Sequence, residues 1–288
     1  MTFRSPDHPI LRSPDSSKFS AIPILLSLLF ITAATVYLFA AHPWWFPAGV
    51  SIHAAAIDHQ FMVALWLLGG LFIAGQLVLG LLLLRSRFNR QTRHSHGSWP
   101  LEITWTILIA CLFFWFNITG NRLWSEIKLH HQEADALQVE VTGTQFQWYF
   151  RYPGSDGQFG RTDAQRFAKP EEGNPLGLDP GDPDGKDDIV SIALVLPVGR
   201  DVDLTLRAND VIHGLFIPAM RFKQDTVPGM STHAHFRPMQ IGTYEIACSQ
   251  LCGLGHYRMR ATARVVTEEE FKQWLKAQSG VREGSSSE

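Results

Sequence analysis

The chain has 288 residues, with 25 Lys and Arg against 27 Asp and Glu, and its formal net charge is −2. This balance, without a basic stripe interleaved with aromatic residues, gives no reason to expect nucleic-acid binding. Three cysteines are too few and too unevenly placed for a disulfide framework. Residues 1–125 are rich in Leu, Ile, Phe and Trp, whereas residues 126–288 have the composition of an ordinary soluble domain.

Three long apolar segments come first. Residues 21–41 and 61–84 carry no charge, and a helix of the first length spans about 32 Å, enough to cross a hydrocarbon core of ~30 Å. A shorter segment at 103–119, bordered by tryptophans that suit the headgroup level, predicts a third span over about 101–122. The first segment also fits a cleaved signal peptide, but its length and the lack of an A-x-A site favour a retained helix.

The distribution of Arg and Lys predicts the orientation. Positive residues lie before the first span and after the second, and the loop at 42–60 has none: Arg4, Arg12, Lys18, Arg85, Arg87, Arg90 and Arg93. The positive-inside rule therefore places residues 1–20 in the cytoplasm. Everything from about residue 126 onward is expected on the outer face.

The outer domain, expected over residues 126–266, has the pattern of an all-β fold. Residues 137–153 alternate at period two, as in a half-buried strand, and residues 188–210 predict two strands around a Pro-Gly turn. The segments "GTYEIACSQ" and "ATARVVT" predict others. Short strands without intervening helices indicate a sandwich or a barrel.

Two further segments of this half are less regular. Residues 155–188 are dense in Gly, Pro and Asp and predict a long loop, either simply solvated or an acidic docking surface for a basic partner. Within the C-terminal segment, 267–288, Thr267 and Glu270 have the spacing of a capping box, which predicts a short helix to about Ala277. The remaining residues are expected to be disordered.

One stretch, "IACSQLCGLGHYRM", gathers candidate metal ligands. Cys248, Cys252, His256 and Met259 lie within it, and His213 lies upstream. Thiolates, imidazoles and a thioether form a soft-to-borderline donor set that suits copper. Two close thiolates can bridge two copper ions, each ion taking one His, with Met259 and a backbone carbonyl of the loop in the weak positions.

Other interpretations of the cysteines are weaker. A disulfide between Cys248 and Cys252 suits an oxidising outer face, but it leaves His256 and Met259 unexplained. A redox dithiol usually has C-x-x-C near a βαβ pattern, which is absent. Copper-delivery proteins of the Sco type also combine C-x-x-x-C with a distant His. They have a thioredoxin-like fold with alternating helices, which this domain lacks. The remaining candidates are surface, near-site or packing residues: His130, His131, His233, His235 and Cys111.

The chain resembles subunit II of haem-copper cytochrome c oxidases over roughly residues 60–266. The resemblance rests on "LEITWT", "QFQWYFRYP", "GKDDIVS", "DVIHGLFIPAMRFKQDTVPGM" and the cysteine stretch. It implies a cupredoxin fold, a Greek-key β-barrel after membrane helices, carrying the binuclear copper centre called CuA. Cys248 and Cys252 would then bridge the coppers. His213 and Met259 would complete one, and His256 and the backbone carbonyl of Gln250 the other.

The resemblance also assigns roles where this sequence departs from the family. Gln250 stands where the family usually has a Glu that helps to hold a magnesium ion shared with subunit I, so that site is left open. Phe146 stands in place of the Trp through which electrons enter, and Trp148 lies two residues on, on the same strand face if the alternation holds. Glu102 matches a family glutamate near a proton pathway. The alternative is an acid at a helix N-terminus that is stabilised by the helix dipole. The first span is additional to the family's hairpin.

Together these features predict the electron-entry subunit of a terminal oxidase in a prokaryotic plasma membrane, not catalytic alone. Its expected partners are cytochrome c or a similar outer-face donor, oxidase subunit I with the other oxidase subunits, and membrane lipid. Electrons would pass to haem in subunit I, where oxygen is reduced to water. The alternatives are a CuA-type subunit of a nitric oxide reductase and a membrane-anchored copper-delivery or assembly protein. The copper cysteines argue against a quinol oxidase.

Overall fold

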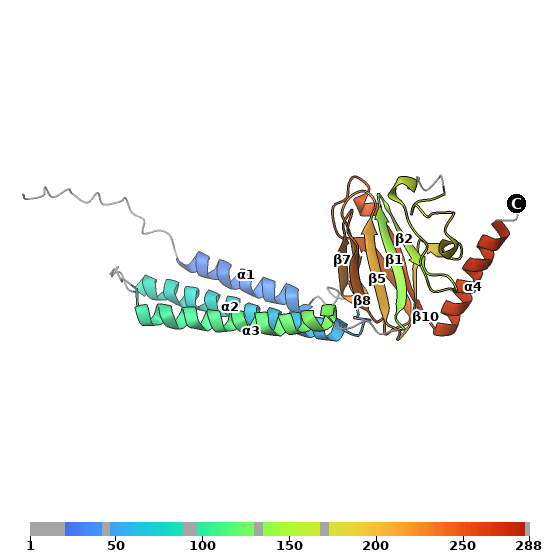
Figure 1. Ribbon diagram of the computed structural model, residues 1–288. Helices are drawn as coiled ribbons and strands as arrows, with labels where there is room; N and C mark the ends of the chain where they lie inside the picture. Colours follow the sequence, from blue (N-terminus) through green and yellow to red (C-terminus); the bar gives the residue numbers. More distant parts are fainter. Residues whose placement is uncertain (1–20, 42–46, 89–96, 130–134, 168–172, 286–288) are drawn as a thin grey trace, which may run out of the picture. The chain divides into compact units, whose positions relative to one another are not determined.

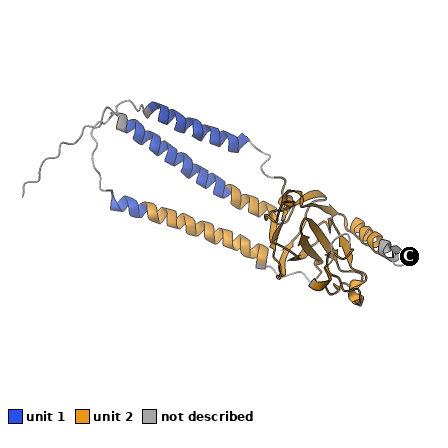
Figure 2. Cartoon of the chain, turned by 90° about the horizontal axis from the view of Figure 1, so that it is seen from above, with its two compact units in different colours: residues 1–45, 63–104 blue, residues 46–62, 105–288 orange. Residues whose placement is uncertain are grey.

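The computed structural model describes residues 21–41, 47–88, 97–129, 135–167 and 173–285, and the chain divides into two compact units (Figure 2). One unit comprises residues 1–45 and 63–104, and the other comprises residues 46–62 and 105–288. The predicted cytoplasmic segment 1–20, His130 and His131 lie outside the described residues.

Among the described residues, three N-terminal helices are long and apolar enough to cross a membrane (Figure 1). They are α1 Ala21–Ala41, α2 Ala54–Phe88 and α3 Trp99–Leu129. The sequence prediction of three helices is confirmed, and α2 and α3 extend beyond the predicted spans of 61–84 and 101–122. The extensions are helical because their residues, such as the alanines that begin α2, have high helix propensity.

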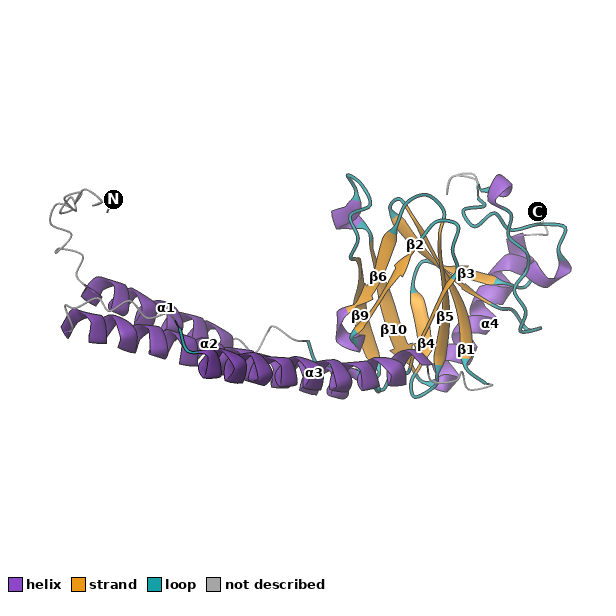
Figure 3. Ribbon diagram, turned by 60° about the vertical axis from the view of Figure 1, so that its left-hand side comes forward, coloured by secondary structure: helices purple, strands orange, loops and turns teal. Residues whose placement is uncertain are grey.

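Within the described residues, ten strands form two five-stranded sheets that enclose one core, and these two sheets are here called the β-domain (Figure 3). The first sheet has the order β3-β2-β1-β5-β8, with β1 and β5 parallel. Its strands are β1 Leu137–Thr144, β2 Gln147–Tyr152, β3 Ile189–Ser191, β5 Val202–Ala208 and β8 Thr232–Phe236. The second sheet has the order β4-β10-β9-β6-β7, with β4 and β10 parallel. Its strands are β4 Leu194–Pro197, β6 His213–Ile217, β7 Phe222–Thr226, β9 Gly242–Cys248 and β10 Arg260–Val266.

Two predicted strands divide in the structure. Residues 137–153 form the hairpin β1–β2, in which Gln145 and Phe146 are the turn and Thr144 faces Gln147. Residues 188–197 form β3 and β4 in different sheets, because the chain bends at Ile192 and Ala193. Alternation alone indicates neither break, since both segments remain rich in strand-forming residues.

The C-terminal helix begins where its capping box predicts and ends later than expected. The Glu270 N–H donates to Thr267 Oγ1 at 3.2 Å, and the Thr267 N–H donates back to Glu270 Oε2 at 3.0 Å. The helix, α4 Glu268–Ser285, therefore starts beside Thr267 but continues past the predicted end at Ala277. Phe271 and Trp274 on its apolar face pack against Tyr152 of β2.

A short segment from the N-terminal half completes one end of the β-domain. Residues 47–54, here called the strap, belong to the same unit as the sheets. The Val50 N–H donates to the Ala219 carbonyl at 2.8 Å, and Ser51 Oγ donates to the Met220 carbonyl at 2.7 Å. The unit that contains the sheets therefore includes residues far from the range 126–266 that the sequence predicts for the outer domain.

An ion pair stabilises the end of the β-domain that the strap completes, here called the strap end. The Arg221 guanidinium donates to both carboxylate oxygens of Asp58, at 2.6 and 2.8 Å, and to the Pro47 carbonyl at 2.8 Å. Arg221 adopts the left-handed conformation with φ 53° just after a 3-10 turn, and its side chain is 8% exposed. A planar guanidinium that binds a carboxylate with two bonds fixes orientation as well as distance. Asp58 lies in the first turns of α2, so this pair ties that helix end to the β-domain.

The described parts of the acidic loop at 155–188 are irregular apart from two short 3-10 helices, as predicted, and several of their acids have partners within the fold. Asp187 accepts hydrogen bonds from the Ser155 N–H and hydroxyl, at 2.5 and 2.9 Å. Asp188 is fully buried and pairs with Arg151 of β2. These carboxylates anchor the loop to itself and to the sheet, which supports a structural role for much of its charge rather than a docking role.

Candidate metal centre

The two cysteines predicted as ligands lie on one tight turn of chain. Cys248 ends β9, and residues 249–259, here called the donor loop, lead into β10. The Cys248 N–H donates to the Met259 carbonyl at 3.1 Å and closes the base of the loop. Gly253, with φ 133°, adopts a conformation that other residues rarely reach, which lets the loop reverse direction.

Closure of the loop brings its donor atoms together. Cys252 Sγ lies 3.8 Å from Cys248 Sγ, 3.8 Å from Met259 Sδ and 3.6 Å from His256 Nδ1. Cys248 Sγ lies 3.2 Å from the Gln250 carbonyl oxygen. The five atoms predicted as ligands from this stretch are therefore neighbours.

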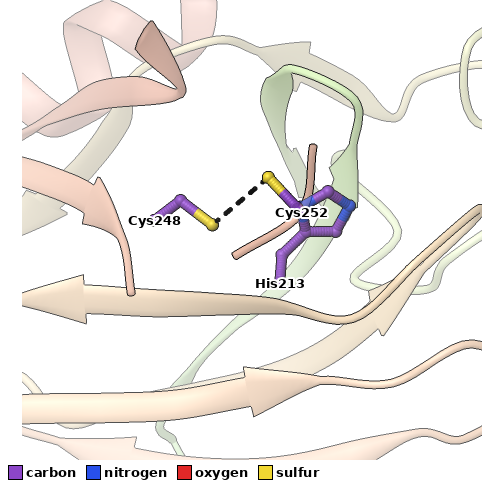
Figure 4. Close-up of side chains that lie close together, drawn as sticks. All are labelled: His213, Cys248 and Cys252. Atoms are coloured by element: carbon purple, nitrogen blue, oxygen red, sulfur yellow. Dashed lines mark hydrogen bonds between the residues drawn. The ribbon is translucent and has the colours of Figure 1, made fainter. Parts of the chain in front are cut away.

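His213 joins them from another strand. It begins β6, is 0% exposed, and has a ligand nitrogen within 4.8 Å of both thiol sulfurs (Figure 4). Its Nε2 lies 2.8 Å from Asp210 Oδ1. Because a carboxylate only accepts, Nε2 carries the proton and Nδ1 keeps its lone pair. That Nδ1 is buried without a hydrogen-bond partner among the described residues.

These donors fit a soft metal better than a disulfide. The two sulfurs are free and 3.8 Å apart, whereas a disulfide requires about 2.05 Å. One ion can touch both sulfurs at metal–thiolate distances of about 2.3 Å. The buried lone pair of His213, the thioether and the free thiols form the soft donor set that copper takes in proteins. The orphaned Nδ1 is explained by such a ligand.

Protonation of the site is tied to its burial. Burial, followed by the influence of the neighbouring Cys248, raises the pKa of the Cys252 thiol to about 11. A metal takes the thiolate, so metal binding releases this proton. For Asp210, burial alone would raise the pKa, but hydrogen bonds from the Gln145 amide, the His213 ring and the Val211 amide lower it below its ordinary value.

Comparison with known proteins identifies the family. Residues 137–266 match the family model described as cytochrome c oxidase subunit II, periplasmic domain. The "Alternative cytochrome c oxidase subunit 2" of Bradyrhizobium diazoefficiens is 34% identical over 266 residues, 90% of this chain and 92% of its own length. This chain belongs to the cytochrome c oxidase subunit II family. The predicted cupredoxin-like domain after three apolar helices is thereby confirmed.

Two further proteins similar to this chain are a relative and a solved domain. The cytochrome c oxidase subunit 2 of Cereibacter sphaeroides is 34% identical over 210 residues, covering 67% of this chain and 66% of its own. The solved periplasmic domain of cytochrome oxidase subunit II from Bradyrhizobium japonicum is 27% identical. It covers 52% of this chain and 96% of its own, with a TM-score of 0.38.

The two aromatic residues proposed for electron entry in subunit II lie in different environments. Phe146 is half-buried in the β1–β2 turn, whereas Trp148 is 0% exposed and lies in β2. The expectation that they share one strand face is wrong, because Phe146 is outside the strand. The Trp148 ring meets the His213 ring edge-on, with centroids 5.9 Å apart.

The Gln250 side chain makes a hydrogen bond to a neighbouring carboxylate. Its Nε2 donates to Asp225 Oδ2 at 2.6 Å, while its backbone carbonyl faces Cys248. Magnesium prefers carboxylates and water. The charged oxygen available at this point is Oδ1 of Asp225, which is buried without a hydrogen bond among the described residues. The magnesium site that the resemblance suggests stays a prediction.

Four other residues singled out from the sequence are not among the clustered donor atoms. Glu102 is exposed in the first turn of α3, where a carboxylate is stabilised by the helix dipole. His233 and His235 alternate on β8, as predicted, and His233 Nδ1 lies 3.3 Å from Thr205 Oγ1. Cys111 is exposed on the apolar surface of α3.

Sequence reasoning missed the residues that hold the ligands. Asp210, three positions before His213, positions its ring. Gly143 lies beneath that ring, where an added Cβ would come within 2.9 Å of His213 Cδ2. A carboxylate near a candidate ligand was the available signal for Asp210. Gly143 had no sequence signal beyond being a glycine inside a strand.

Proposed function

We propose that this chain is the electron-entry subunit of a respiratory terminal oxidase and holds a binuclear copper centre of the CuA type. The convergence of the donor atoms carries this proposal. Free thiols, a buried imidazole lone pair, a second imidazole, a thioether and a carbonyl oxygen meet at one end of the β-domain. The subunit II family provides the context in which such a site relays electrons.

The ligands divide between the two ions by residue. Cys248 and Cys252 would bridge them through their thiolates. His213 Nδ1 and Met259 Sδ would complete one copper, and His256 Nδ1 and the Gln250 carbonyl the other. Met259 is fully buried, which suits a thioether that acts as a weak, water-free ligand. When bound, the two coppers accept and release one electron.

The protein's own residues would keep this exchange fast by changing little. Asp210 fixes the tautomer and orientation of His213, and Trp148 packs against the edge of the same ring. Cys248 and His213 lie at strand ends and Met259 directly precedes β10, so the ligands have little freedom to move. Small movement between oxidation states keeps the reorganisation cost of electron transfer low.

Electrons are proposed to enter beside Phe146 from cytochrome c or a similar donor on the outer face. Phe146 reaches the surface and its ring lies over the donor loop, whereas an external donor cannot touch the fully buried Trp148. Electrons would leave for haem in subunit I, where oxygen is reduced to water. The three helices would hold the subunit in a prokaryotic plasma membrane, with Glu102 at the inner end of α3 near a proton pathway.

The decisive test is metal content together with electron paramagnetic resonance (EPR) of the full chain in detergent. Two coppers per chain, with one unpaired electron shared equally by both nuclei, would establish the centre. A single copper that a chelator removes readily would contradict it and indicate a copper-delivery protein. Purification of the whole complex and assay of its terminal acceptor would separate an oxidase from a nitric oxide reductase.

A further inference from the structure

The β1–β2 turn makes contacts that electron entry does not require. Gln145 is exposed, yet its side-chain Nε2 donates to the Cys252 carbonyl at 2.5 Å. Its backbone N–H donates to Asp210 Oδ2 at 2.7 Å. One residue of the turn therefore binds both the donor loop and the carboxylate that orients His213.

The next residue of the turn covers the donor loop. A Cβ placed on Gly255 would lie 2.4 to 2.7 Å from three atoms of the Phe146 ring, and one placed on Gly253 would lie 3.2 Å from Phe146 Cζ. The ring therefore rests directly on the backbone of both glycines. Only residues without side chains allow this approach, so the loop and the ring fit each other closely.

These contacts connect three segments that are distant in sequence. His213 binds Asp210 Oδ1, Asp210 Oδ2 binds the Gln145 N–H, and the Gln145 side chain binds the Cys252 carbonyl. The start of β6 and the donor loop supply separate ligands, and this chain of hydrogen bonds runs from one to the other through the turn. All of its partners are protein groups, so none of these hydrogen bonds requires a metal ion.

We propose that the turn formed by Gln145 and Phe146 is a clamp that pre-assembles the copper site in the metal-free protein. Gln145 is its positioning residue. The role of this clamp rests on the proposed copper function, whereas its contacts do not. Ordering a loop costs roughly 1–2 kcal/mol per residue in backbone entropy, and a site ordered in advance does not incur that cost when the ion binds.

The experiment compares three variants of the full chain in detergent. Gln145→Ala removes the side chain, and Gln145→Glu keeps its size but removes the N–H donor. Gln147→Ala is the matched control, because the hydrogen bond of Gln147 Nε2 among the described residues goes to the neighbouring Trp148 carbonyl, at 3.3 Å, and not to the donor loop. Hydrogen exchange is measured on the metal-free proteins, and the rate of copper loss to a chelator is measured on the loaded ones.

The clamp predicts a local effect. In both Gln145 variants, amides of residues 249–258 should exchange about fivefold to tenfold faster, the size expected for loss of one hydrogen bond. Copper should be lost faster by a similar factor, and exchange in β5 and β10 should not change. Gln147→Ala should behave as wild type. The EPR spectrum should remain binuclear, because every ligand is present.

Two results would overturn the clamp. One is unchanged exchange in the donor loop of both Gln145 variants, and the other is faster exchange throughout the β-domain, which would indicate a general role in folding. Failure of the copper proposal is a separate outcome. A wild-type chain that binds no copper would refute it, while the exchange of the metal-free loop would still report on the clamp.

Discussion

The two ends of the β-domain use polar groups in opposite ways. Where β6 begins, His213 Nδ1 is buried without a hydrogen bond among the described residues, and two free thiols face it. Beyond the other end of β6, the strap donates to backbone carbonyls and Arg221 binds Asp58 with two bonds. An end that binds an ion keeps lone pairs free of hydrogen bonds, whereas an end that stabilises the fold uses its polar groups in hydrogen bonds.

This difference between the two ends predicts that substitutions at the metal-site end change copper binding. Substitutions at the strap end should change the free energy of unfolding and leave copper binding unaltered. The largest effect should come from Cys248→Ser or Cys252→Ser. A serine oxygen cannot replace a bridging thiolate, so the shared-electron EPR signal should vanish and copper should fall from two per chain to one or none. Metal analysis and EPR measure both. Full copper with full oxidase activity in Cys252→Ser would refute the ligand assignment.

A crowding substitution at the same end should affect both properties. Gly143→Ala would place a Cβ 2.9 Å from His213 Cδ2 and 3.1 Å from Trp148 Cζ3. Overpacking of this kind costs about 1–3 kcal/mol of unfolding free energy, and it should also displace the His213 ring and weaken copper binding. Chemical unfolding and copper titration measure these effects.

Gly181→Ala is the control for that substitution, because its Cβ would have ordinary contact at 3.4 Å with Asp179 Oδ1. Wild-type copper affinity in Gly143→Ala would show that the ring tolerates the shift.

Breaking the strap end should reduce stability and leave the metal site unaltered. Arg221→Ala removes a nearly buried guanidinium from Asp58, and we expect a loss of about 1–2 kcal/mol in unfolding free energy with an unchanged EPR spectrum. The control is Arg260→Ala, whose pair with Glu245 is largely exposed and should contribute about 0–1 kcal/mol. An altered copper spectrum in Arg221→Ala would show that the two ends are coupled.

The metal-free site should make stability depend on alkaline pH. The pKa of Cys252 is raised from 9.0 to about 11, so the folded state keeps a proton that the unfolded state loses. The contribution of this protonated thiol to the free energy of unfolding is complete below pH 9. It is lost as pH rises through about 11, at up to about 1.4 kcal/mol per pH unit. Unfolding of the metal-free chain from pH 8 to 11, with Cys252→Ser as the control, measures it. Equal slopes for the two proteins would contradict the assignment.

The smallest effect should come from Met259→Leu. Leucine fills a similar volume in the core, so copper should stay bound while the reduction potential shifts, because a thioether ligand mainly tunes the potential. Potentiometric titration measures the shift. Complete loss of copper would show that Met259 is a structural rather than a tuning ligand.

The sequence predicts local features of this site better than distant ones. Cys248, Cys252, His256 and Met259 lie between positions 248 and 259, so any tight loop between two strands brings them together. His213 reaches them only because β6 pairs with β9, where Leu215 faces Cys248. A pairing of strands so far apart has no local signal.

The missed features all depend on tertiary structure. The Gln145 bond to Cys252 and the strap's bonds to Ala219 and Met220 join segments whose own residues only indicate a turn and a loop. The helices were predicted because a continuous apolar run reports its environment directly. Their ends were not, since propensity decides them only weakly.

The strap also sets an order of events during synthesis. Ser51 and its partner Met220 are separated by 169 positions. At a synthesis rate of about 5–20 residues per second, one leaves the ribosome roughly 10–30 s before the other. The β-domain can complete this end only where the loop between α1 and α2 already waits on the same side of the membrane. Closure of the domain therefore depends on correct insertion of the first two helices, and a chain inserted the wrong way round cannot finish folding.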